Sequence, residues 1–204
     1  MQPLIVVSLL AALLTLACGS IPQTHYYTIG RPLAQAQTGA PGKTGLVVGV
    51  PRLEAEGIYA RDNLLYRSGG HEITPDYYRR WGVPPQKMLA EAMIDYLRAG
   101  GAFGQVLRLP SMSEVDLVLA GRILRFEQVQ DQVGSHTLVN LEFILRDPGD
   151  QSVLWRSEFS DTTLVGAIPS AEAVVAAFES SVHSCLKQAA AAVAEAAVKL
   201  AGAK

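Results

Sequence analysis

The chain has 204 residues, with 17 Lys and Arg against 19 Asp and Glu, and a formal net charge of -2 at pH 7. This length suits a single domain that buries a real core without help from metal ions or disulfides. The sequence has no basic stripe, no run of like charges and no acidic tail, so nucleic acid is excluded as an expected partner.

Residues 1–17 have the pattern of a lipoprotein signal peptide. They contain no ionisable side chain, and the apolar run over residues 4–17 is shorter than the roughly 20 residues that a membrane-spanning helix needs. Its length is typical of the apolar core of a signal peptide. The run ends in the small residue Ala17, followed by Cys18, as in a lipobox. We therefore predict cleavage before Cys18 and acylation of its thiol.

Two features depart from the usual signal. Thr15 stands three residues before the cysteine, where Leu is common, and no Lys or Arg precedes the apolar run, which leaves open a start further upstream. A buried N-terminal helix that contains a cysteine and a secreted protein without an anchor remain the alternatives.

The anchor predicts a location in the bacterial cell envelope, facing the periplasm. Several acyl chains on Cys18, each buried methylene contributing about 0.8 kcal/mol, would hold the chain stably at a membrane. Gly19 stands where an Asp often retains lipoproteins in the inner membrane. Its presence favours the outer membrane.

The rest of the chain divides into a tether and one domain. Residues 18–45 are expected to form the lipidated N-terminus and a tether, because residues 30–45 are rich in Ala, Gln, Gly, Pro and Thr and lack periodicity. Residues 46–204 are expected to form a single α+β domain. Its first strand is the apolar run over residues 46–50, which lies between a glycine and a proline.

The middle of the chain predicts a hairpin followed by a helix. Ile58 and Tyr59 are expected in a strand, and residues 63–73 form two strands around a glycine pair. Residues 86–98 repeat apolar side chains at intervals of three and four, which predicts an amphipathic helix.

The last third predicts three strands and a second helix. Apolar and polar residues alternate over residues 117–123, 139–146 and 153–159, which favours an antiparallel meander. Ser170 can cap a long Ala-rich helix that runs toward the C-terminus. The order of elements predicts an α+β fold, with a mostly antiparallel sheet and two main helices packed on one face.

The sequence carries no pattern of an enzyme. Its histidines do not stand three or four residues from one another or from a cysteine, which leaves metal binding unsupported: His25, His71, His136 and His183. There is no Gly-x-Ser-x-Gly, no His-Glu-x-x-His and no Walker sequence. Cys185 lies in an apolar helical pattern, as an unreactive core thiol would. We predict that the chain is not an enzyme and uses neither a metal nor a cofactor.

One cluster of aromatic residues and arginine is a candidate partner interface, since such residues are favoured at the centres of protein interfaces. Its members are Tyr59, Tyr66, Tyr78, Arg79 and Trp81, with Tyr77 and Arg80 beside them. The competing interpretation is that Tyr78 and Trp81 close the end of the sheet against the first helix.

Several short motifs resemble those of the ABC-type transport auxiliary lipoprotein family. Residues 26–29, Tyr-Tyr-Thr-Ile, are similar to its Tyr-Tyr-Thr-Leu segment, and residues 48–53, Val-Gly-Val-Pro-Arg-Leu, resemble its Val-Gly-Pro-Val-Arg-Leu pattern. Residues 78–81, Tyr-Arg-Arg-Trp, resemble its Phe-x-x-Trp. The helix that begins at Pro84 and Pro85 is similar to the helix that follows in the family.

The resemblance implies a noncatalytic periplasmic lipoprotein of an ABC transport system that works with MCE-type proteins. Such a system moves phospholipid or another hydrophobic molecule across the envelope, and its MCE-domain protein, permease and ATPase are separate chains. The resemblance also implies that the chain can form a homo-oligomer. The alternative from a different class is an assembly or pilotin-like lipoprotein for an outer-membrane complex.

Overall fold

The computed structural model describes residues 22–30, 43–132, 134–166 and 169–202. Cys18 therefore lies outside the described residues. In chain order the elements are β1 (His25–Tyr27), β2 (Val47–Val50), β3 (Glu54–Ala55), the 3-10 helix η1 (Gly57–Ala60), β4 (Asn63–Ser68), β5 (Glu72–Trp81), α2 (Pro85–Gly100), β6 (Gln105–Arg108), β7 (Leu117–Asp131), β8 (Gly134–Arg146), β9 (Val153–Gly166) and α3 (Ala171–Gly202).

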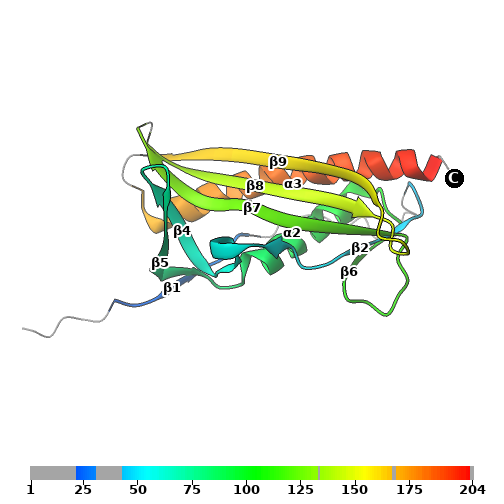
Figure 1. The fold of residues 1–204 in the computed structure, drawn as a ribbon, viewed down its shortest axis with the longest axis horizontal. Helices are drawn as coiled ribbons and strands as arrows, with labels where there is room; N and C mark the ends of the chain where they lie inside the picture. The colour runs from blue at the N-terminus through cyan, green and yellow to red at the C-terminus, as the bar shows by residue number, and fades with distance from the viewer. Residues whose placement is uncertain (1–21, 31–42, 133, 167–168, 203–204) are drawn as a thin grey trace, which may run out of the picture.

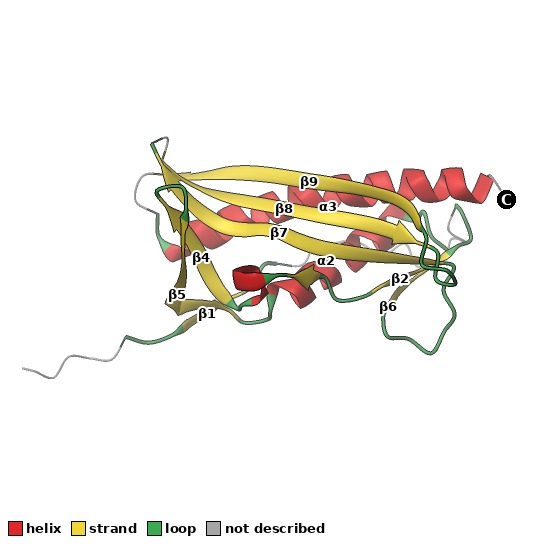
Figure 2. Ribbon diagram, in the orientation of Figure 1, coloured by secondary structure: helices red, strands yellow, loops and turns green. Residues whose placement is uncertain are grey.

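The fold has two layers, a sheet and a pair of helices (Figure 1). Helices α2 and α3 cover one face of a nine-stranded sheet, and the short η1 lies over part of the other face in the view of Figure 2. The predicted α+β class, with two main helices on one face, is confirmed. The sheet, however, is mixed, because β1, β2, β3, β4 and β6 all take part in parallel pairs.

Strand β7 is the centre of this sheet. Along one edge it pairs antiparallel with β8, and β8 pairs antiparallel with β9, as the alternating sequence predicted. Along its other edge β7 pairs in succession with β2, β3 and β4, all parallel to it. The antiparallel ladders are the long ones, and the parallel partners are short strands that the alternation of residues could not reveal.

The chain forms its first strand earlier than the sequence indicated. His25–Tyr27 pair in parallel with the end of β5, and the backbone N–H of Gly82 donates to the carbonyl oxygen of Tyr27 at 2.7 Å. Ile29 is only 4% exposed and belongs to the main core. These residues lie in the segment expected to be a tether, and they join the body because Tyr27 and Ile29 have apolar surface to bury.

A second difference concerns Ile58 and Tyr59, which the sequence placed in a strand. They belong to the single turn of η1 instead. Gly57, at a φ of 57°, directs the chain into this turn, and that left-handed conformation favours glycine. The hydroxyl of Tyr59 then reaches Glu127 of β7, at 3.0 Å.

Both helices follow their sequence signals. The Pro85 ring sits in the first turn of α2, and Gly101 ends the helix at a φ of 61°. The hydroxyl of Ser170 accepts a hydrogen bond from the N–H of Ala173 at 3.2 Å, and Glu172 lies in the first turn of α3. Both features stabilise the start of that helix.

Three aromatic rings join the sheet to α3. Trp81 of β5 lies 5.4 Å from Phe126 of β7 and 5.4 Å from Phe178 of α3, measured between ring centroids, and Phe126 and Phe178 are 4.7 Å apart. Packed rings of this kind contribute beyond their buried area. They bring together three elements that are far apart in sequence.

We expect Trp81→Ala to lower the free energy of unfolding by about 3–5 kcal/mol, because it leaves a cavity among the rings. The matched control is Tyr77→Ala on the same strand, where the side chain is 72% exposed. That change should stay within about 0.5 kcal/mol. Urea unfolding of both variants measures the difference, and equal losses would contradict this account of the core.

Candidate functional site

The five residues predicted to form a partner interface do not share one surface. Trp81 is 2% exposed and packs against Phe178 of α3, so it belongs to the core and not to an interface. Tyr59 turns its hydroxyl to Glu127, and Tyr66 is exposed on β4. Tyr78 and Arg79 remain on the surface, both on β5.

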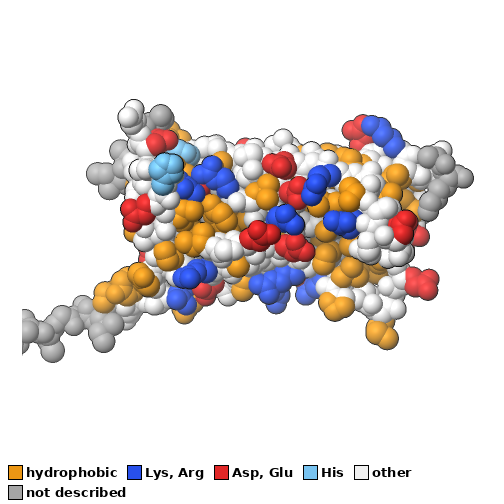
Figure 3. All heavy atoms as spheres, viewed as in Figure 1, with side chains coloured by type: hydrophobic (Ala, Val, Ile, Leu, Met, Phe, Trp, Pro, Cys, Tyr) orange, Lys and Arg blue, Asp and Glu red, His pale blue; other side chains and the backbone are white. Residues whose placement is uncertain are grey.

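Tyr78 and Arg79 belong to a surface at the edge of the sheet, where β1 pairs with β5. We call this the β1–β5 edge surface and define it by the exposed Tyr26, Tyr77 and Tyr78 and the half-buried Arg79 and Arg80. Tyr26 is 65% exposed, Tyr77 72% and Tyr78 46%. The register pairs Tyr26 with Arg80, so the two strands place all five side chains at one edge of the sheet. At this end Figure 3 shows hydrophobic side chains together with Lys and Arg.

A buried carboxylate that the sequence analysis missed lies further along the sheet. The side chain of Glu127 on β7 is 0% exposed. Arg67 of β4 donates to it through Nε at 3.0 Å and Nη2 at 3.1 Å, Arg125 through Nε at 2.9 Å, and the Tyr59 hydroxyl at 3.0 Å. Glu127 thus links η1 and β4 to the central strand through these hydrogen bonds.

A β-bulge explains why Glu127 lies where it does. The register between β7 and β8 shifts between Ile123 and Arg125. An extra residue in one strand reverses which face the following side chains occupy. Phe126 therefore joins Phe178 of α3, and Glu127 points to the opposite face, where Tyr59 and Arg67 meet it.

The surroundings of Glu127 lower the pKa of its carboxyl. Burial alone would raise this pKa, but hydrogen bonds from Arg67, Arg125 and Tyr59 favour the charged form and outweigh it. The hydrogen bond to Glu127 raises the pKa of Arg67, and the contact with Tyr59 adds to this effect. The carboxylate is held charged by structural partners, which leaves it poorly suited to exchange protons with a substrate.

Cys185 and His183 are also engaged in contacts within the fold. Burial, together with the charge of Asp161, raises the pKa of the Cys185 thiol to about 12. Its sulfur lies 3.6 Å from the carbonyl oxygen of Phe159. His183 Nδ1 lies 3.0 Å from the hydroxyl of Tyr96. Within the part of the chain that the structure describes, no group of three His, Cys, Asp or Glu side chains could hold a metal ion.

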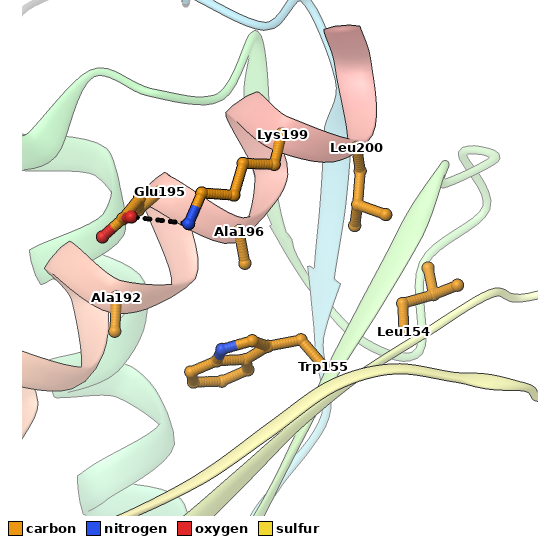
Figure 4. A pocket seen from close by; sticks show the side chains of 7 residues that line it. All are labelled: Leu154, Trp155, Ala192, Glu195, Ala196, Lys199 and Leu200. Atoms are coloured by element: carbon orange, nitrogen blue, oxygen red, sulfur yellow. Dashed lines mark hydrogen bonds and ion pairs between the residues drawn. The ribbon is translucent and has the colours of Figure 1, made fainter. Parts of the chain in front are cut away.

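The distal half of α3 leaves recesses because alanine fills little space. In Figure 4, Ala192 and Ala196 face the ring of Trp155, and Lys199 pairs with Glu195 at 2.7 Å on the rim. This recess holds about 240 Å³. Pockets for small molecules usually run from about 300 to 1,000 Å³, so it is small for a ligand.

Across residues 22–30, 43–132, 134–166 and 169–202, neither helix is long and apolar enough to cross a membrane.

We expect Glu127→Gln to lower the free energy of unfolding at pH 7 by about 3–5 kcal/mol, because it leaves Arg67 and Arg125 without their buried partner. The pKa of Glu127 is lowered in the folded state, so its charged form stabilises above the unfolded-state pKa of about 4.3, and that stabilisation is lost as the pH falls through the lower folded-state pKa. The difference in the free energy of unfolding between Glu127→Gln and the wild type should therefore become smaller at low pH.

Urea unfolding at pH 7 and at a pH of about 3 measures this gap. Glu195→Gln is the matched control, since the pair of Glu195 with Lys199 is 70% and 73% exposed, and exposed pairs contribute about 0–1 kcal/mol. A gap for Glu127→Gln that is the same at both pH values would count against a charged carboxylate.

Comparison with known proteins identifies the family. The model of the ABC-type transport auxiliary lipoprotein component matches residues 27–194. Among solved structures, the chain is similar to protein XCC0632 from Xanthomonas campestris, with 18% identity and a TM-score of 0.71 over 89% of this chain and 98% of that one. It is also similar to the hypothetical protein CT253 from Chlamydia trachomatis, with 10% identity and a TM-score of 0.53 over 78% of this chain and 98% of that one.

At such low identity these structures support the fold alone, and no curated protein gives a match. The family model, in contrast, spans most of the chain and agrees with the resemblance found in its motifs. The chain belongs to the ABC-type transport auxiliary lipoprotein family.

Proposed function

We propose that the chain is a noncatalytic lipoprotein subunit of an MCE-type ABC transport system, which moves phospholipid or another hydrophobic molecule across the envelope. Acyl chains on Cys18 anchor it to the periplasmic face of the outer membrane, where it tethers or completes the conduit. Its partners are the MCE-domain protein, the permease and the ATPase of the same transporter.

The observation that carries this proposal is the way the N-terminal segment enters the body. His25–Tyr27 are a strand of the same sheet that holds the core, and they begin shortly after Cys18. Fully extended, the residues from Cys18 to His25 reach at most about 25 Å. An anchor on Cys18 would therefore hold the folded body close to the bilayer.

The noncatalytic part of the proposal is supported by what the reactive side chains do. Glu127 is enclosed by Arg67, Arg125 and Tyr59, and the Cys185 thiol is buried with a strongly raised pKa. These contacts serve packing. A subunit that positions other chains needs surfaces for them and does not need a reaction centre.

We expect the partners to be recovered by cross-linking intact membranes and purifying the lipidated chain. Mass spectrometry should then identify an MCE-domain protein among the cross-linked chains. Recovery of a secretin or pilus component without any MCE-domain protein would replace this proposal by the pilotin-like alternative.

We expect Cys18→Ala to abolish palmitate labelling and to leave the protein unprocessed or mislocalised, because the acylated thiol is lost. Cys185→Ala is the matched control, since it removes the other cysteine and should keep both labelling and outer-membrane fractionation. If Cys18→Ala still took up palmitate and still fractionated with the outer membrane, the anchor would have to be elsewhere.

A further inference from the structure

We propose that the β1–β5 edge surface lies directly against the lipid headgroups of the bilayer. This inference rests on the proposed acylation of Cys18 and adds an orientation to it. It assigns Tyr26, Tyr77, Tyr78, Arg79 and Arg80 to contact with a phospholipid surface, and not with a protein partner.

The path of the chain supports this orientation. The register pairs His25 with Arg79 in parallel, so Tyr77 and Tyr78 directly precede the residues of β5 that pair with β1. From Cys18 to His25 the extended chain reaches at most about 25 Å. The exposed tyrosines therefore lie near the strand that an acylated Cys18 would hold close to the membrane. Figure 1 shows β1 at the end of the molecule opposite the C-terminus of α3.

The chemistry of the exposed tyrosine rings suits a lipid surface. Tyr77 is 72% exposed and Tyr26 is 65% exposed, although large aromatic rings are costly to leave in water. Tyrosine is enriched where a bilayer meets water, because its ring enters the apolar boundary while its hydroxyl stays in the polar layer. Neighbouring residues of a strand point to opposite sides, so Tyr77 and Tyr78 can straddle the edge of the sheet.

Two arginines at this edge can bind lipid phosphate groups. Arg79 Nε lies 2.5 Å from a carboxylate oxygen of Asp76, and Arg80 Nη1 lies 3.6 Å from Asp62. A guanidinium has five N–H donors, more than one carboxylate pair uses. Both side chains are more than a third exposed. They can therefore donate to the phosphate groups that a lipid surface presents, with the aspartates fixing their direction.

A fluorescence experiment on the lipidated full chain tests this contact. Tyr77→Trp places a reporter on the β1–β5 edge surface, and Val198→Trp places one on exposed helix near the far end of α3. Both variants keep the native Trp81 and Trp155 as a common background. Each is reconstituted into vesicles of phosphatidylethanolamine and phosphatidylglycerol, with and without brominated acyl chains that quench tryptophan on contact.

We expect brominated lipid to remove much of the added emission in Tyr77→Trp and to leave that of Val198→Trp nearly unchanged. Equal quenching of the two variants would overturn the proposed contact, and so would the absence of quenching in both while the protein stays on the vesicles. Neither result would contradict the anchor on Cys18. If brominated lipid did not change the emission of Tyr77→Trp, but an added membrane protein protected this emission from quenching by acrylamide, the surface would be assigned to a protein partner. That result would also overturn the proposed contact with lipid. Protein that fails to stay on the vesicles would instead refute the acylation of Cys18.

Discussion

The sheet depends on strand β7, because β7 pairs with other strands along both of its edges. On one edge it carries the long antiparallel meander of β8 and β9, and on the other it receives β2, β3 and β4 in succession. Every other strand joins the sheet through one of these partners. Since β4 pairs with β5, and β5 pairs with β1, the position of the N-terminal strand follows from that of β7.

The bulge in β7 changes which of its side chains face the helices and which face the opposite side of the sheet. Before it, Leu119 and Ile123 face the helices, and after it, Phe126 does so in their place. Glu127 is thereby turned to the opposite face, where Arg67 holds β4 in position. A buried ion pair contributes little net stability compared with apolar packing, but removing one partner is costly. The cluster around Glu127 therefore fixes the register of β4 against β7.

The sequence predicted the parts whose signals are local. Alternation revealed the meander, spacing revealed α2, and Ser170 marked the start of α3, because each pattern spans adjacent turns or pleats. The strands β1, β3 and β6 were missed, since two to four residues in a parallel pair carry no alternation. The alternating pattern of β7 ended at Ile123, because the bulge that follows reverses it.

The site was predicted less well than the fold, for the same reason. The cluster of tyrosines, arginine and tryptophan was found by composition, but only the register separates the buried Trp81 from the exposed Tyr78. Tyr26 could not be joined to that cluster, because its pairing with Arg80 links positions far apart in the chain. Glu127 resembled an ordinary exposed position of an amphipathic strand, and its partners come from η1 and β4.

Residues 25–29 are part of the folded body, although they lie in the stretch predicted to be a tether. Hydrogen exchange of the full chain tests this placement most directly, by comparing the amides of residues 25–29 with those of β7 and with those of exposed loops. We predict that residues 25–29 are protected well above exposed loops such as the turn at Gly69 and Gly70, because they lie in the sheet and beside the core. Exchange of residues 25–29 as fast as in those loops would contradict this placement, since these residues would then not be held in the sheet.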